Sequence, residues 1–361
     1  MSRASKAITG ALKSAVPSLI ALGLGLAAGS VMMILFGLNP LVIFEDIFSG
    51  ALGTQFGQSY VLSYLGSYIL LALAFLIPGK AGIWNVGGQG QATLGGIVVA
   101  LIVVFVPLPP GIWAFVAILA ACAVGALWSS VSGFLEAYRN ASAIVTTIML
   151  NFVASAFATF LLLLAIIPKV PVAAIYDRVD ISPAATLPTL PYFNASIMVV
   201  VAIIIAIGTY FFLGRTTLGY RIRATGLGMT QAEAKGINPR RNKVIAMAIG
   251  GALAGLAGAG DILGVGRGCY LTACYQDGFV SGWFGGEGFA GIVVALMAAN
   301  NPVGSIFTGL FVAILATGMA AVFQNIYPVW AMQGIIVLLM SAPTLSKSIL
   351  NLRRGRGRKW N

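Results

Sequence analysis

The chain has 361 residues, of which 59% are hydrophobic and only 8% are charged. So few charged side chains cannot cover a soluble globule of this size, and the composition therefore indicates a polytopic membrane protein. The chain has no histidine and only three cysteines, which argues against a metal site or a redox centre. We expect no metal and no cofactor in the chain itself.

Apolar runs of roughly 18 to 25 residues predict membrane helices. The first five expected spans cover residues 16–38, 59–79, 84–106, 111–135 and 143–167. A second set of five covers residues 196–213, 244–264, 288–299, 302–324 and 329–345, and the eighth span is unusually short. We therefore expect an all-α polytopic membrane protein of about ten transmembrane helices, forming one transmembrane domain over residues 1–361.

The net charge of +12 is concentrated on one side of this topology. All Lys and Arg residues except Lys169, Arg178 and Arg267 fall at the termini or in loops on that side. By the positive-inside rule, both termini are expected in the cytoplasm. The basic tail 346–361 could be taken for a nucleic-acid site, but contact with anionic lipid headgroups explains it without a nucleic-acid partner.

Two phrases suggest an internal repeat. They are GGQGQATLGGIVVAL at residues 87–101 and GGEGFAGIVVAL at residues 285–296. On the predicted topology they cross the membrane in opposite directions, which is expected of two inverted five-helix halves. A chance similarity between two low-complexity apolar runs is the alternative.

The cytoplasmic loop 214–243 contains the segment GMTQAEAKGINPRR. Thr230 and Glu233 have the spacing of a capping box, and Gly236 is expected to stop the helix in a left-handed conformation before a turn at 238–239. The predicted helix of about two turns is too short to be stable alone. It is therefore expected to rely on a docking surface, unless the loop simply faces lipid and contains an incidental helical turn.

Polar side chains inside predicted spans are candidates for a solute pathway, because such groups usually face a cavity or another helix. In the fifth span Thr147, Asn151, Ser155 and Thr159 share one helical face, which can line a pathway or bond to a neighbouring helix. In the third span the segment NVGGQGQ brings together Asn85, Gln89 and Gln91. These neutral amides suit a neutral, hydrogen-bonding solute, although a hydrated turn at the cytoplasmic end would also explain them.

Tyr64 and Tyr68 lie one turn apart on the second span and could flank a flat ring, although ordinary packing is the simpler interpretation. Asp261 and Glu287 are expected near the outer ends of spans, where they could bind the extracytoplasmic receptor or the entering solute, although solvated loop acids are the simpler interpretation. Cys269 and Cys274 share that outer loop and could form a disulfide or remain free thiols.

Four segments carry a resemblance to a known family. Residues 216–259 resemble the cytoplasmic signature A-x-G-x-N-x-x-A-A-x-x-x-G-I of ABC importer permeases for branched-chain amino acids, simple sugars and nucleosides. The segments GIWNVGGQGQATLGG (82–96), SAIVTTIMLNFVA (142–154) and GFAGIVVALMAANNPVGSIFTGLF (288–311) are similar to three further motifs of that group. The resemblance covers most of residues 40–345 and is strongest to nucleoside-type permeases that work with basic membrane lipoprotein binding proteins.

The resemblance implies a type II ABC importer-like fold in the plasma membrane of a prokaryote, with a coupling helix between the sixth and seventh spans. The expected coupling residues are Thr230, Gln231, Ala232, Glu233, Ala234, Lys235 and Gly236. The expected partners are a cytoplasmic ATP-binding cassette ATPase, a second permease subunit (a paralogue or a second copy), an extracytoplasmic substrate-binding lipoprotein and membrane lipid. Since the sequence has no G-x-x-x-x-G-K-[ST] motif, the ATPase would bind the ATP.

The expected function is therefore that of a permease subunit, which is not an enzyme and has no catalytic residues. It would translocate a small, polar, neutral solute, a nucleoside in the first instance, by alternating access. Two alternatives remain open at this point: an ABC permease for a sugar or a flavin, and an ion-coupled secondary transporter of a small polar solute.

Overall fold

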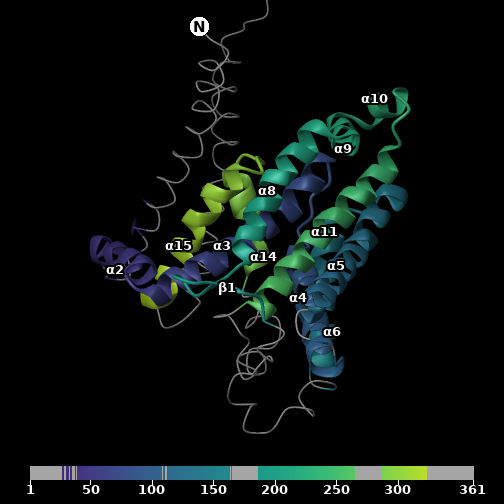
Figure 1. Ribbon diagram of the computed structural model, residues 1–361. Coiled ribbons are helices and arrows are strands. Elements are labelled where there is room, and N and C mark those ends of the chain that lie inside the picture. The colour runs from purple at the N-terminus through teal and green to yellow at the C-terminus, as the bar shows by residue number, and fades with distance from the viewer. Residues whose placement is uncertain are drawn as a thin grey trace, which may run out of the picture.

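The computed structural model describes residues 39–107, 112–162, 186–264 and 286–322, together with a few single positions outside these ranges. Within them the chain is helical, apart from one short hairpin (Figure 1). The helices are α2 (Pro40–Leu52), α3 (Gln55–Lys80), α4 (Gly88–Phe105), α5 (Ile112–Arg139), α6 (Ala143–Leu161), α8 (Met198–Arg215), α9 (Thr217–Leu227), α10 (Met229–Ala234), α11 (Pro239–Leu263), α14 (Glu287–Met297) and α15 (Gly304–Val322). Seven of the described helices are long and apolar enough to cross a membrane, and α14 is a shorter apolar helix, so the chain is a multi-pass membrane protein.

Each expected span from the second to the ninth coincides with a helix. The tenth span and all but a few single positions of the first lie outside the described residues, as do the tail 346–361 and the two cysteines of the outer loop. The total of ten helices therefore stays a prediction. Two helices were not predicted: α2, and α9 at the start of the basic loop.

Helices α3 and α11 form the centre of the bundle. Nearly every residue in the second half of α3 is buried, on all sides of the helix, because α8, α11, α14 and α15 all pack against it. A helix that is apolar around its whole circumference is expected in such a buried position. In Figure 1, α3 passes behind α8, and α5 runs alongside α11.

Small residues allow α5 and α11 to touch through their backbones. A Cβ atom added at Gly251 would lie 2.2 Å from the carbonyl oxygen of Gly125, and one added at Gly255 would lie 2.1 Å from that of Ala121. Since both distances are far below van der Waals contact, no larger residue fits without separating the helices. The two helices are therefore expected to move as one body.

The bundle has two different ends. At one end, α9 and α10 lie next to the first residues of α11 (Figure 1). At the opposite end of α11, a hairpin of β1 (Thr189–Leu190) and β2 (Ala195–Ser196) lies against the start of α3. Gln55 Nε2 donates a hydrogen bond of 2.6 Å to the carbonyl oxygen of Tyr192 in the hairpin turn, which fixes the hairpin to α3.

Candidate functional site

The segment before α4 is held by a reciprocal pair of amides. Asn85 Nδ2 donates to Gln91 Oε1 at 3.1 Å, and Gln91 Nε2 donates to Asn85 Oδ1 at 2.9 Å. Asn85 Nδ2 also donates to the carbonyl oxygen of Ala74 on α3, and both amide side chains are 1% exposed. These two candidate pathway residues therefore bond to each other and to the chain, and they fix the start of α4 against α3.

Asn151 of α6 bonds to the first turn of α4. Its Oδ1 accepts a hydrogen bond of 2.9 Å from the backbone N–H of Gly90, and its Nδ2 donates to the carbonyl oxygen of Val86 at 3.0 Å. The first amides of a helix have no partner within the helix, and the N-cap residue Gly87 has no side chain to supply one. Asn151 thus caps α4 from a neighbouring helix, and its burial on the inner face of α6 agrees with the predicted polar stripe.

Gln89 joins the two repeat-like phrases. Its Oε1 accepts a hydrogen bond of 2.8 Å from the backbone N–H of Gly288, in the first turn of α14. A Cβ atom added at Gly288 would lie 2.4 Å from the backbone nitrogen of Gln89, so the two helix starts are in direct contact. The N-termini of α4 and α14 therefore meet inside the bundle, where their positive dipole ends favour electronegative atoms.

The remaining pathway candidates lie on the same helices. Thr147 is buried beside Asn151, and its hydroxyl donates back to the carbonyl oxygen of Ala143 at 2.6 Å. On α3 the rings of Tyr64 and Tyr68 lie 5.5 Å apart, with Tyr68 buried and Tyr64 half-buried against the core. Contact of any of these side chains with a solute stays a prediction.

The expectation that Asp261 and Glu287 are solvated loop acids is wrong. Each is only 6% exposed. Asp261 belongs to the last turn of α11 and accepts a hydrogen bond of 2.5 Å from Ser67 Oγ on α3, beside a small cavity that Ser63 and Ser196 also line. Glu287 is the first residue of α14, where the helix dipole favours a carboxylate. Both acids lie near helix ends, where the packing of α3 and α4 covers them, and the assignment of these ends to the outer side stays a prediction.

The basic loop contains two helices instead of one. The predicted capping box at Thr230 is wrong, because α10 begins at Met229 and its N-cap is Gly228, which offers no side chain. Since α9 ends at Leu227, Gly228 is the whole connection, and the second helix starts earlier than expected. Glu233 is exposed.

The predicted end of this helix is confirmed. Gly236 has a φ of +72°, its N–H donates to the carbonyl oxygen of Glu233 at 2.9 Å, and the N–H of Ile237 donates to that of Ala232 at 3.0 Å. These two bonds form a Schellman motif. Asn238 then caps α11 by accepting a hydrogen bond of 3.0 Å from Arg241 N, so the expected turn is also the start of the next helix.

The surface of α9 and α10 carries a groove that the sequence did not predict. It has a volume of about 220 Å³ and is lined by Tyr220, Arg223, Ala224, Leu227, Gln231, Ala232 and Lys235. Leu227 is 90% exposed, although it is a large apolar residue in a basic loop. Underneath, Gly226 of α9 packs against the carbonyl of Lys80 so closely that no Cβ atom would fit. Leu227 thus offers an exposed apolar contact beside the groove, on a helix that is firmly anchored to the bundle.

Comparison with known proteins finds one family model and several relatives that match most of the chain. The model of the family described as branched-chain amino acid transport system, permease component, matches residues 57–342. The chain is 31% identical to the nucleoside ABC transporter permease protein NupB of Lactococcus lactis, over 83% of this chain and 82% of the relative. It is 30% identical to the glucose ABC transporter permease protein TsgB13 of Haloferax volcanii (82% and 78%), and 27% identical to the guanosine ABC transporter permease protein NupP of Bacillus subtilis (83% and 84%). No solved structure gives a significant match.

Proposed function

Because the chain belongs to the permease family of branched-chain amino acid transport systems, we propose that it forms the membrane pathway of an ATP-driven nucleoside importer. The chain is the permease component of an ABC transporter, so ATP hydrolysis occurs in a partner subunit. The observation that carries the proposal is the anchored α9–α10 surface with its exposed Leu227, because a chain that does not hydrolyse ATP needs a surface on which to receive force.

The proposed occupant of the α9–α10 surface is a cytoplasmic ATP-binding cassette ATPase. Leu227 and the adjoining groove offer apolar contact, while Arg223 and Lys235 on the groove wall suit an acidic partner surface. In this proposal residues 230–236 are the coupling segment, the α9–α10 end is cytoplasmic, and both termini lie on that side of a prokaryotic plasma membrane. In the same proposal the chain forms a single permease domain.

Force applied to α10 would act on α11, because only residues 235–238 separate the two helices. Since α11 and α5 touch through their backbones, they would move together, and alternating access would follow from rigid-body movement of this pair. We propose ten helices in two inverted halves. The contact between Gln89 and Gly288 supports this arrangement, because equivalent segments of inverted repeats commonly meet at a central binding site.

The proposed cargo is a nucleoside. Two of the three relatives described above transport nucleosides or guanosine by name, and neutral amides suit a neutral base and ribose. The proposed pathway is lined by Asn85, Gln89, Gln91, Thr147, Asn151, Tyr64 and Tyr68. A sugar is the second candidate, because the Haloferax relative is a glucose permease. The further proposed partners are a second permease subunit and a substrate-binding lipoprotein that would dock at the end with the hairpin.

The docking proposal is tested by replacing residues 229–236 with a Gly-Ser linker of equal length. The variant is expected to insert into the membrane, because the spans are unchanged, but to lose both co-purification of the ATPase and solute uptake. Leu227→Asp is the matched point variant. Since Leu227 is exposed, this substitution should leave the permease folded and weaken ATPase binding at least tenfold, or about 1.4 kcal/mol. Normal ATPase binding and uptake by the linker variant would contradict the proposal.

A further inference from the structure

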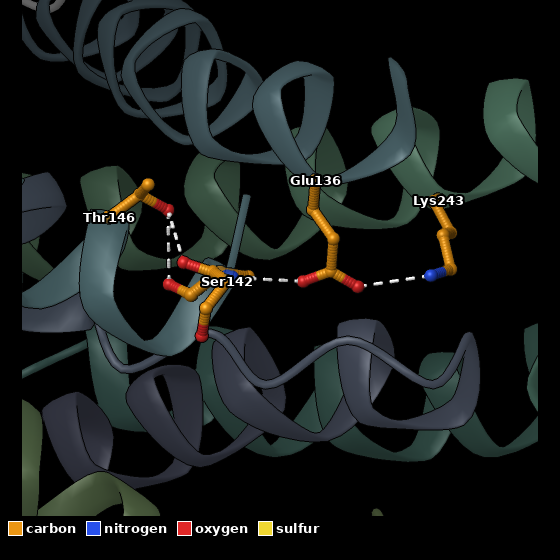
Figure 2. Close-up of polar contacts among 5 residues, drawn as sticks. Glu136, Ser142, Thr146 and Lys243 are labelled. Carbon is orange, nitrogen blue, oxygen red and sulfur yellow. Dashed lines mark hydrogen bonds and ion pairs between the residues drawn. The ribbon is translucent and has the colours of Figure 1, made fainter. Parts of the chain in front are cut away.

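The carboxylate of Glu136 lies at a junction of three helices. Glu136 is in the last turn of α5, and its Oε1 forms an ion pair of 3.0 Å with Lys243 Nζ on α11. Its Oε2 accepts a hydrogen bond of 3.0 Å from the backbone N–H of Ala143, the first residue of α6. Figure 2 shows Glu136 between Lys243 and the start of α6, with one oxygen directed toward each. This is the only ion pair between described residues of the chain.

The start of α6 depends on this carboxylate. The N-cap residue Ser142 makes no capping hydrogen bond with its side chain. Glu136 therefore supplies an acceptor to one of the amides that a helix leaves without a partner, and its negative charge faces the positive end of the helix dipole. A second contact from α5 lies nearby, where Ser132 Oγ donates to Thr146 Oγ1 at 2.8 Å. Thr146 is also bonded to Ser142 (Figure 2).

The junction lies between the two parts of the proposed machinery. On one side, Lys243 is in the second turn of α11, one turn beyond the segment that joins α10 to α11. On the other side, α6 continues from Ala143 to Asn151, which holds Gly90 at the start of α4. Most of the remaining surface of α6 is apolar and exposed, so polar contacts with other helices are few along it. Since α5 and α11 move together, a displacement of this pair can reach α6 through the Glu136 carboxylate, which Lys243 holds in position.

We propose that Glu136 is a positioning residue that transmits the movement of the α10–α11 junction to α6, and that it thereby sets how much solute crosses per ATP hydrolysed. This inference rests on the proposed function. The side-chain chemistry explains why the residue is an acid. Both partners are hydrogen-bond donors, so a group with two acceptor oxygens serves both, whereas glutamine would direct an N–H₂ group at one of them.

The test uses the complete transporter, with the permease pair, ATPase and binding lipoprotein reconstituted in vesicles. Radiolabelled guanosine imported per ATP hydrolysed is measured for Glu136→Gln, Lys243→Met and the double variant. Each single variant is expected to lower this ratio about two- to tenfold while ATP is still hydrolysed. The double variant is expected to lower the ratio no further than the more affected single variant, because both substitutions break the same connection. Glu45→Gln, which removes an exposed acid on α2, is the control with an unchanged ratio.

A purely structural ion pair would give a different result. Fewer folded complexes would form, but each would import as much guanosine per ATP as the native complex, and this outcome would overturn the inference. If Glu136→Gln does not fold, Lys243→Met decides, because it leaves the contact with Ala143 in place. If the native complex imports guanosine and the variants keep its ratio of guanosine imported to ATP hydrolysed, only the role of Glu136 is overturned. A native complex without ATP-dependent uptake overturns the proposed function instead.

Discussion

Replacing Gly255 with leucine is expected to prevent the normal packing of α5 against α11 and to remove most of the folded protein. The backbone of Gly255 is also in contact with α4, because a Cβ atom added at Gly95 would lie 2.7 Å from the Cα atom of Gly255. A leucine side chain at Gly255 would point at Ala121 and would have to push α5 away from α11, at a point where the Gly255 backbone already touches α4. Overpacking of this kind costs about 3 kcal/mol or more, a large part of the stability of a typical domain.

Thermal unfolding of the purified permease in detergent, followed by size-exclusion chromatography, measures this effect. Gly208→Leu is the matched control, because Gly208 is an exposed helical glycine on α8 with no neighbouring atom within 4 Å of an added Cβ. The control is expected to keep its melting temperature. Equal losses in the two variants would mean that the close contact between α5 and α11 is not what makes Gly255 necessary, since leucine is itself a better helix former than glycine.

Asn85→Leu is expected to have the second largest effect. It leaves the buried side-chain amide of Gln91 and the carbonyl of Ala74 without the partners that Asn85 provides. Each unsatisfied buried polar group costs about 1 to 3 kcal/mol, so the single variant should be strongly destabilised. Nucleoside uptake should fall in proportion to the amount of folded permease. If this segment lines the pathway, uptake per folded molecule should fall as well.

The double variant Asn85→Leu/Gln91→Leu separates packing from transport. Removing both amides leaves fewer unsatisfied groups, so the double variant should be more stable than the sum of the two single losses predicts. Folded double variant without uptake supports a pathway role for this segment. Native uptake per folded molecule would show that the amide pair only holds α4 in place, and additive losses of stability would contradict the reciprocal pair itself.

The sequence predicted the membrane helices well, because hydrophobic length is a local property of the chain. The helix α2 was missed for the same reason: its 13 residues are too few for a span, and Glu45 and Asp46 interrupt its apolar run. The start of α10 was placed at Thr230 because a capping box can be read locally. The preceding helix α9, which moves that start to Met229, has no hydrophobic run of its own.

The candidate site was predictable in its residues but not in its contacts. Polar side chains in apolar spans singled out Asn85, Gln91 and Asn151 as pathway candidates, with a hydrated turn as the alternative for the first two. The structure buries all three, and their contact with a solute stays a prediction. Their partners depend on packing: Asn151 is 61 residues from Gly90, and Gln89 is 199 residues from Gly288. Glu136 and Lys243 are 107 residues apart, and nothing in the local pattern of either helix indicates that they meet.

The most direct test of the account is the energy source for uptake. Purified permease, ATPase and binding lipoprotein are reconstituted in vesicles, and accumulation of radiolabelled guanosine is followed with and without ATP. We expect accumulation only when ATP is hydrolysed, and none in vesicles that contain the permease alone under a sodium or proton gradient. Accumulation by the permease alone on such a gradient would contradict the claim that force enters through the α9–α10 surface.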